Sequence, residues 1–279
     1  MVLSAGLGTR LRPLTEHTAK PLVPVGDRPA LAHVLDHLRA AGVPRVVVNA
    51  HHLAGQVVAF ARAQPGDVRV SEEAELLGTA GGIAHARGLL GEGDVLVWNG
   101  DILADVDVGA LVRAHEAVAT LVVQPLARGE GAVGLDGQGR VVRLRSERFG
   151  DETRGGQFLG IHVLGAALRE RLASPGGLVE DVLVPALARG EVVRAFEFHG
   201  AWHDIGTLES YREANLAWLA ARGLASWVAP DARVASSVSL DRSLVGAGAV
   251  VEGEGSLARC IVWPGARAVA PMHDRIVTA

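Results

Sequence analysis

The chain has 279 residues, of which 49% are hydrophobic and 21% are charged, so it is long enough to bury a full core in one large or two modest domains. Its formal net charge of −4 offers no general attraction for nucleic acid or for an anionic membrane, so any affinity for phosphate must be local. The single cysteine excludes an intramolecular disulfide framework, and no apolar run is long enough to span a membrane, so we expect a cytoplasmic protein.

A loop rich in glycine and arginine follows the first predicted strand, Val2-Leu3. The segment Gly6–Thr15 reads GLGTRLRPLT, and Lys20 comes shortly after it. Two glycines let backbone N–H groups approach an anion closely, and the basic side chains supply charge that neutralises a polyphosphate. The loop lacks both the Gly-Lys-Ser/Thr of a Walker loop and the third glycine of a dinucleotide fingerprint. We interpret it as a triphosphate cradle at the carboxyl end of a strand, with a plain glycine turn as the alternative.

Strands alternate with helices through most of the chain. Apolar runs without polar alternation indicate strands covered on both faces, and apolar residues at helical spacing indicate helices that pack on them. This pattern predicts an α/β fold with a Rossmann-like, mostly parallel sheet and helices on both faces. The predicted elements, in chain order, are a helix from Pro29 to Gly42, strands at Arg45–Asn49, Val95–Trp98, Leu121–Val123 and Val193–Phe198, and a helix from a Thr207 N-cap to Arg222.

The residues after this last helix have a different periodicity. Apolar residues recur every six positions, with one slip of one residue, at Val228, Val234, Leu240, Val245, Val251, Leu257, Trp263 and Val269. A six-residue period predicts a short left-handed β-helix of hexapeptide repeats, with an irregular tail as the alternative. We therefore expect two domains, residues 1–223 and 226–279. So short a solenoid buries little by itself, so we expect it to dock on the first domain or to form a homo-oligomer.

Two aspartates follow predicted strands. Asp101 comes directly after the strand Val95–Trp98, and Asp204 lies between a strand and the helix that begins at Thr207. Magnesium prefers oxygen ligands and commonly takes one or two carboxylates together with substrate phosphates, so these two residues suffice to hold Mg²⁺. Taken singly, each has an ordinary structural alternative, as a turn former or a residue near a helix start. His51 and His52 are adjacent and lack other ligands nearby, so we do not expect a metal there.

The segment Gly6–Leu22 resembles the characteristic motif of the sugar-1-phosphate nucleotidyltransferases, which join a nucleoside triphosphate to a sugar phosphate and release pyrophosphate. One departure is Ala19, where the family usually has proline. The segments around Asp101 and at Trp202–Thr207 are similar to the family's Gly-Asp and Trp-x-Asp-x-Gly-Thr elements, which hold the catalytic cation. The resemblance implies that Arg10, Lys20, Asp101 and Asp204 are catalytic and that the two aspartates bind Mg²⁺.

A third element, Glu75–Gly82 (ELLGTAGG), resembles the family segment that holds the nucleobase. Its glycines also predict a turn and an N-cap before a helix at Ile83–Arg87, and the two roles are compatible. The nucleotide-binding residues implied by the resemblance are Ala5, Gly6, Gly8, Thr9, Arg10, Glu75, Gly78, Thr79 and Gly100.

On the sugar-phosphate side the resemblance implies Glu147, Arg148, Gly160 and Glu180. Arg148 stands where the family usually has lysine, and Leu159 replaces a small polar residue before Gly160, so sugar preference does not carry over. Glu147 and Glu180 have an equally good alternative as exposed surface charges.

The mechanism implied by the resemblance is in-line attack by a sugar-1-phosphate oxygen on the α-phosphorus of the nucleoside triphosphate. Arg10 would neutralise the departing pyrophosphate, and Lys20 would orient the α-phosphate or the sugar phosphate. The six-residue tail resembles that of mannose-1-phosphate guanylyltransferases, whereas Asn49–Leu53 resembles N-acetylmuramate-1-phosphate uridylyltransferases; we favour the former.

Other hexose-1-phosphate uridylyl- or thymidylyltransferases and a non-catalytic regulatory subunit that binds nucleotide sugars remain alternatives. An acyltransferase is disfavoured because the coils are few and His273 is the only histidine after His203. A dinucleotide oxidoreductase is disfavoured by the missing third glycine.

Overall fold

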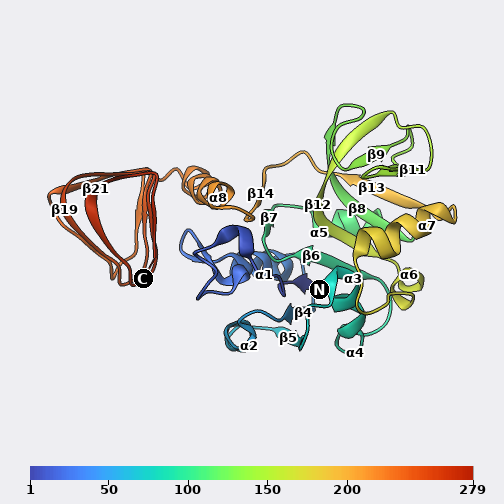
Figure 1. The fold of residues 1–279 in the computed structure, drawn as a ribbon, viewed down its shortest axis with the longest axis horizontal. Helices are drawn as coiled ribbons and strands as arrows, with labels where there is room; N and C mark the ends of the chain where they lie inside the picture. The colour runs from blue at the N-terminus through green and yellow to red at the C-terminus, as the bar shows by residue number, and fades with distance from the viewer. Residues whose placement is uncertain (279) are drawn as a thin grey trace. The chain divides into compact units, whose positions relative to one another are not determined.

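The computed structural model of this chain describes residues 1–278. The chain divides into two compact units, each assembled from segments that are separate in the sequence. Unit 1 comprises Met1–Leu7 and Val34–Trp202, and unit 2 comprises Gly8–His33 and the chain from His203 onward. The expected boundary between residues 223 and 226 stays a prediction. Figure 1 follows the elements of both units in chain order.

Unit 1 is built on a mixed sheet in which, over the described residues, ten strands pair. The order along the sheet is β11-β10-β9-β12-β6-β1-β4-β5, and β8 pairs with β12 and β13. The strands are β1 (Val2–Leu3), β4 (Arg45–Ala50), β5 (Asp67–Glu72), β6 (Val95–Asn99), β8 (Ala119–Leu126), β9 (Val133–Leu135), β10 (Val141–Leu144), β11 (Glu147–Arg148), β12 (Arg154–Leu164) and β13 (Val193–Glu197).

Parallel and antiparallel pairing occupy different parts of this sheet. β6, β1, β4 and β5 run parallel, and so do β8 and β13. β12 runs antiparallel to β6, β8 and β9. The α/β class is therefore confirmed, with a mixed sheet in which β12 interrupts the parallel order.

The parallel strands are buried on both faces, as their apolar runs predicted. Val46 through Ala50 are all buried, and so are Val95, Val97 and Trp98. Helix α1 turns Leu31, Val34, Leu35 and Leu38 to the interior, each at most 2% exposed. The core of unit 1 continues under β8, β9 and the segment around Leu183.

The helices and remaining strand of this part of the chain are short. They are α1 (Ala30–Ala40), α2 (Ala54–Arg62), α3 (Gly78–His85), α4 (Arg87–Leu90), β7 (Ile102–Ala104), α5 (Val108–Arg113), α6 (Ala166–Glu170), the π-helical turn η3 (Val179–Leu183) and α7 (Val184–Ala188). The helix predicted at Ile83–Arg87 in fact begins five residues earlier, at Gly78. Gly81 and Gly82 lie inside it, where a Cβ on Gly82 would lie 2.7 Å from Glu73 Oε1 and one on Gly81 would lie 3.1 Å from the Gly176 backbone.

Unit 2 joins an N-terminal segment to helix α8 (Leu208–Ala221). The segment contains the 3₁₀ turns η1 (Thr9–Leu11) and η2 (Lys20–Leu22) and a hairpin of β2 (Pro24–Val25) and β3 (Arg28–Pro29). Tyr211 donates a 2.7 Å hydrogen bond to the Pro24 carbonyl, and Asn215 Oδ1 accepts one from Gly26 N. Burial raises the pKa of Tyr211. These contacts fix α8 against the hairpin.

The predicted N-cap of α8 is confirmed. The Thr207 side chain accepts a hydrogen bond from Ser210 N, and Ser210 in turn bonds the Thr207 backbone. At the other end, Gly223 has a φ of 64°, and Leu224 N donates to the Leu219 carbonyl, which stops the helix. Strand β14 (Trp202–Asp204) leads into the cap.

The C-terminal strands pair in parallel, each with the strand one repeat further along the chain. One sheet contains β15 (Trp227–Val228), β18 (Leu244–Val245), β20 (Ile261–Val262) and β22 (Ile276–Val277); the other contains β16 (Arg233–Val234), β17 (Val238–Asp241), β19 (Val250–Ala258) and β21 (Arg267–His273). Trp227 pairs with Leu244, and Leu244 with Ile261, each 17 residues further along, whereas Ile261 pairs with Ile276, 15 residues further along.

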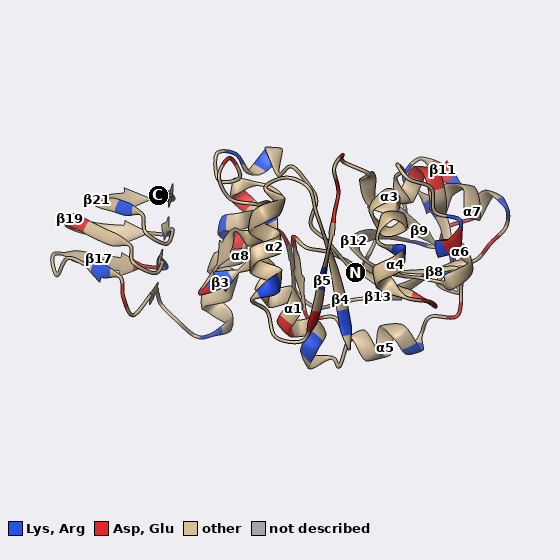
Figure 2. Cartoon of the chain, turned by 90° about the horizontal axis from the view of Figure 1, so that it is seen from below, with Lys and Arg blue, Asp and Glu red and all other residues tan. Residues whose placement is uncertain are grey.

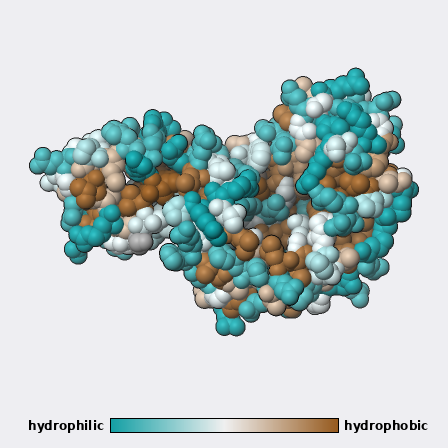
Figure 3. All heavy atoms as spheres, viewed as in Figure 1, coloured by the Kyte–Doolittle hydropathy of each residue, from teal (hydrophilic) through white to brown (hydrophobic). Residues whose placement is uncertain are grey.

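The six-residue period coincides with buried side chains in the middle of this region but not at its edges, and the left-handed β-helix stays a prediction. Val245, Val251, Leu257 and Trp263 are buried, but Val228 is 38% and Val269 60% exposed. In β21 the buried residues are Ala268 and Ala270, because successive side chains on a strand point to opposite faces and Val269 lies between them. Figure 3 shows a band of apolar side chains across these strands.

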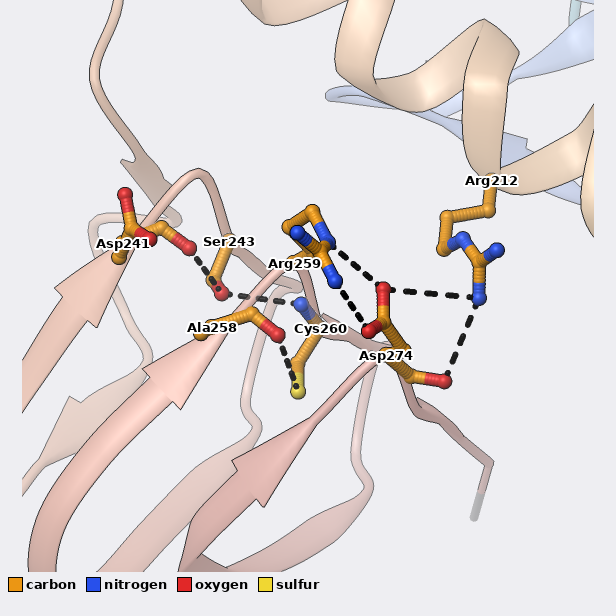
Figure 4. Close-up of polar contacts among 7 residues, drawn as sticks. All are labelled: Arg212, Asp241, Ser243, Ala258, Arg259, Cys260 and Asp274. Carbon is orange, nitrogen blue, oxygen red and sulfur yellow. Dashed lines mark hydrogen bonds and ion pairs between the residues drawn. The ribbon is translucent and has the colours of Figure 1, made fainter.

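Polar contacts tie α8 to the C-terminal strands within unit 2. Trp263 Nε1 donates to the Tyr211 hydroxyl at 2.8 Å. Figure 4 shows Asp274 held by Arg259 on one side and by Arg212 of α8 on the other. The two arginines lower the pKa of the Asp274 carboxyl, with the Arg259 hydrogen bond as the main cause. Among residues 1–278, no helix has both the length and the apolarity needed to cross a membrane.

Candidate active site

The glycine-arginine loop folds back on itself in unit 2. Gly8 has a φ of 65°, and a Cβ there would lie 2.9 Å from Thr15 Cγ2 and 3.2 Å from Lys20 Cβ. Thr15 Oγ1 donates to the Gly8 carbonyl at 2.7 Å, and Leu11, fully buried, anchors η1. The loop therefore needs glycine at position 8. This packing brings the start of the Lys20 side chain against Gly8 and leaves Arg10 exposed.

Arg10 and Asp204 flank the same backbone position. A Cβ on Gly206 would lie 3.0 Å from Asp204 Oδ1 and 3.1 Å from Arg10 Nη2. Within unit 2 the structure thus brings together the Arg10 guanidinium, from the glycine-arginine loop, and the Asp204 carboxylate, from the segment Trp202–Thr207. The absence of a side chain at Gly206 makes room for both. Sequence reasoning named Arg10 and Asp204 as site residues but gave Gly206 no role.

Asp101 belongs to unit 1, at the end of β6. Gly100 N donates to the Leu3 carbonyl at 2.8 Å, and a Cβ on Gly100 would lie 2.5 Å from Ser4 Oγ. Trp98 Nε1 donates to the Ile102 carbonyl, which closes the turn that carries Asp101. The turn thus depends on a glycine pressed against the end of β1.

The predicted base-binding element forms the start of α3. Gly78 has a φ of 74°, and a Cβ there would lie 2.5 Å from the Gly176 carbonyl oxygen. That carbonyl accepts hydrogen bonds from Ala80 N and Gly81 N. Glu75 is exposed and Thr79 half-buried, so both remain accessible from outside the core. The loop around Gly176 leads directly into η3, which carries Glu180.

The four predicted sugar-side residues lie in three elements of unit 1. Glu147 and Arg148 are exposed and form β11, which pairs with β10. Glu180 is exposed and forms an ion pair with Arg145, a residue that the sequence did not single out. Gly160 has a φ of 73° at a bulge in β12, and a Cβ there would lie 2.4 Å from Asn99 Nδ2. Gly160 is thereby placed beside the turn that carries Asp101.

His162, two residues after Gly160, is a core residue. It is 1% exposed, and its ring packs on Phe158 with 5.7 Å between ring centroids. Burial lowers its pKa to about 3, so the ring is neutral at physiological pH. His51, the first of the adjacent histidines, bonds the Glu73 carbonyl through Nδ1.

A cavity of about 420 Å³ lies in unit 2 between the N-terminal segment and the C-terminal strands. Its lining is mainly apolar and includes Pro13, Leu14, Trp227 and Trp263. Neither Arg10 nor Lys20 lines it, so this cavity is not the predicted phosphate cradle. Figure 2 shows basic and acidic residues interspersed along the chain.

Comparison with known proteins identifies the family. The family model described as nucleotidyl transferase matches residues 1–221. An N-acetylmuramate alpha-1-phosphate uridylyltransferase of Caulobacter vibrioides is 47% identical over 123 residues, which are 42% of this chain and 51% of that protein. A mannose-1-phosphate guanyltransferase of Aspergillus fumigatus is 30% identical over 233 residues, which are 78% of this chain and 64% of that protein. The matched region thus spans about half to two thirds of these relatives.

Solved structures share the fold at low sequence identity. HddC from Yersinia pseudotuberculosis, solved with GMP-PN, has a TM-score of 0.66 and 23% identity, covering 78% of this chain and 97% of HddC. A putative glucose-1-phosphate thymidylyltransferase from Bacillus anthracis gives the same TM-score at 20% identity, covering 77% of this chain and 93% of that protein. With the family model matching most of the chain, the protein belongs to the nucleotidyl transferase family.

Proposed function

We propose that this chain joins a nucleoside triphosphate to a sugar-1-phosphate, releasing pyrophosphate and a nucleoside diphosphate sugar. The observation that carries the proposal is the arrangement at Gly206, where the Asp204 carboxylate and the Arg10 guanidinium approach one backbone position. Family membership gives the class of reaction, and this arrangement supplies oppositely charged groups of the kind that nucleotidyl transfer requires.

In the proposed mechanism the chain positions and neutralises phosphates and supplies no nucleophile. The sugar phosphate oxygen attacks the α-phosphorus in line, the α–β bridging P–O bond breaks, and pyrophosphate leaves with that electron pair. Arg10 neutralises the leaving group, and Lys20 orients the α-phosphate or the sugar phosphate. The backbone of Gly6 and Gly8 gives the triphosphate a close approach.

The donor set fits magnesium. Asp101 and Asp204 both offer carboxylate oxygens, and both are half-buried. Residues 1–278 contain no group of three or more His, Cys, Asp or Glu side chains that could hold a metal by themselves, but magnesium needs only one or two carboxylates beside substrate phosphates. In this proposal Asp101 and Asp204 hold Mg²⁺, which when bound would offset charge on the phosphate oxygens.

For the substrate, we propose mannose-1-phosphate and GTP. The relatives aligned over 78% of this chain in Schizosaccharomyces pombe and Aspergillus fumigatus are mannose-1-phosphate guanyltransferases. N-acetylmuramate-1-phosphate with UTP is the second candidate, favoured by the 47% identity of the shorter Caulobacter match. We further propose that the C-terminal parallel strands form a left-handed β-helix through which the protein oligomerises, and that the protein works in the cytoplasm.

A pyrophosphate-release screen tests the function. Purified protein is assayed with each of four nucleoside triphosphates against a panel of sugar-1-phosphates, with and without Mg²⁺. We expect turnover for one pair, and a fall in kcat of at least about a hundredfold for Asp101→Asn and for Asp204→Asn. Asp231→Asn, at an exposed position of unit 2, is the matched control. Near-normal turnover by both site variants would refute their roles, and no turnover with any pair would refute the function.

A further inference from the structure

A buried side-chain pair in unit 1 joins segments that the proposed site uses. Asn49 lies near the end of β4 and Glu73 follows β5, and they are 3% and 5% exposed. Asn49 Nδ2 donates to Glu73 Oε1 at 2.7 Å. Neither residue was selected as a site residue from the sequence. Burying polar side chains is unfavourable unless their hydrogen-bonding groups are paired, so the contacts of this pair indicate what it holds in place.

Each member of the pair holds a backbone N–H of a different motif. Asn49 Oδ1 accepts a 2.6 Å hydrogen bond from Ser4 N, directly after β1 and before the glycines of the phosphate loop. Glu73 Oε2 accepts a hydrogen bond from Leu77 N at 3.3 Å, and Leu77 is the N-cap residue of α3. Three hydrogen bonds therefore link Ser4, at the start of the phosphate loop, to Leu77, in the middle of the base-binding element. They run through the side chains of Asn49 and Glu73.

The glycines around the pair show how closely these segments fit. A Cβ on Gly82 would lie 2.7 Å from Glu73 Oε1 and 2.8 Å from Asn49 Nδ2, so α3 passes directly over the pair. Ser4, held by Asn49, lies against Gly100, the residue before Asp101. A change at the pair would thus shift α3 and the end of β1, both of which belong to the proposed nucleotide site.

We infer that Asn49 and Glu73 are positioning residues that set the base-binding element Glu75–Gly82 relative to the start of the phosphate loop at Ser4, and so control nucleotide affinity and base selectivity. This inference rests on the proposed function, because that function makes both segments parts of one nucleotide site. The pair acts through the backbone at Ser4 and Leu77, without touching the nucleotide. The inference predicts that a change at this pair alters KM for the nucleoside triphosphate without an equal change in KM for the sugar phosphate.

The test exchanges the polarity of the pair. In Asn49→Asp the donor to Glu73 is lost and two carboxyl groups face each other; in Glu73→Gln the side chain keeps one acceptor oxygen for two N–H donors. The double variant Asn49→Asp/Glu73→Gln restores all three hydrogen bonds, because the new amide at position 73 can donate to the new carboxylate at position 49 while its oxygen accepts from Leu77 N. Gly88→Ala, an exposed glycine with open space around it, is the control.

We expect each single variant to raise KM for the nucleoside triphosphate about tenfold and to change the ranking or spread of kcat/KM among the four nucleotides. KM for the sugar phosphate should change less than about twofold, and the double variant should recover to within about threefold of wild type. Equal changes in both KM values, no change in either, or no recovery in the double variant would overturn the inference. Gly82→Ala, which presses on the same pair, replaces a single variant that fails to fold.

A second readout does not depend on activity. Amide hydrogen exchange at Ser4 and Leu77 should quicken at least about tenfold in the single variants and return toward wild type in the double variant. If the wild-type chain turns over no nucleotide and sugar phosphate, the proposed function fails, and the exchange data still decide whether the pair holds both backbone segments. If the wild type is active and exchange is unaffected in the single variants, the inference alone fails.

Discussion

Adding one methyl group at Gly206 tests the proposed catalytic arrangement without removing any charged group. The backbone of Gly206 lies outside the left-handed region, so alanine is sterically allowed there. Its N–H donates to Ser210 Oγ, and this hydrogen bond is retained in the variant. The new Cβ, however, would meet Asp204 Oδ1 at 3.0 Å, Arg10 Nη2 at 3.1 Å and Asp204 Oδ2 at 3.2 Å.

The size of the effect follows from these distances. Ordinary van der Waals contact begins at 3.4 Å, so the Asp204 carboxylate must move by about 0.4 Å. Arg10 has a long side chain and can shift its end easily, whereas the short Asp204 side chain must rotate or carry its backbone along. A displacement of about 1 Å at a catalytic group costs about a hundredfold in rate, so about 0.4 Å should lower kcat roughly five- to tenfold.

The assay is pyrophosphate release by Gly206→Ala, with Gly55→Ala as the control. Gly55 lies in α2, and a Cβ there would meet no other atom within 4 Å, so alanine should leave kcat unchanged and slightly stabilise the helix. Thermal unfolding of both variants checks that each is folded. A folded Gly206→Ala protein with wild-type kcat and KM would show that the position of the Asp204 carboxylate does not matter for turnover, and would refute the reasoning.

Three further predictions concern stability and reactivity. Thr207→Ala should lower the free energy of unfolding by about 1 kcal/mol in urea titrations, because the N-cap acceptor of α8 is lost, and Thr207→Ser should retain most of it. The hydrogen bond from Arg143 lowers the pKa of Glu152 below its ordinary 4.5, so this buried pair stabilises the fold above pH 4.5 and the contribution is lost as the pH falls; Arg143→Met should cost about 3 kcal/mol at pH 7 and less at pH 4. Cys260 is fully buried, and burial raises the pKa of its thiol, so a thiol reagent at pH 8 should label the folded chain about a hundredfold more slowly than the urea-unfolded chain; equal rates would contradict this.

The elements that the sequence predicts well are those whose type and ends are determined by their own local residue pattern. The apolar run around Val47 reads as a doubly covered strand whatever it pairs with, and Thr207 with Gly223 marks both ends of α8. The predicted start of the helix near Ile83 is five residues too late, because Gly78, Gly81 and Gly82 are locally typical of a turn. These positions are glycines because of tertiary contacts: the Gly176 backbone and the Asn49–Glu73 pair occupy the space that side chains would need.

The same distinction separates the site residues that the sequence indicated from those it did not. Arg10 and Asp204 stand in motifs whose chemistry is readable, since clustered arginines and a strand-ending aspartate suggest phosphate and metal. Asn49 and Glu73 stand in no pattern that indicates a role, because that role is defined by their hydrogen-bond donors Ser4 N and Leu77 N. These donors reach the pair only when β1 and β4 pair and α3 packs over it. Groups that contact substrate are chosen for their chemistry and can be found in a sequence. Groups that hold those segments in place are defined by their position in the folded structure. They are therefore recognised only from the structure, as buried polar side chains that hydrogen-bond to those segments.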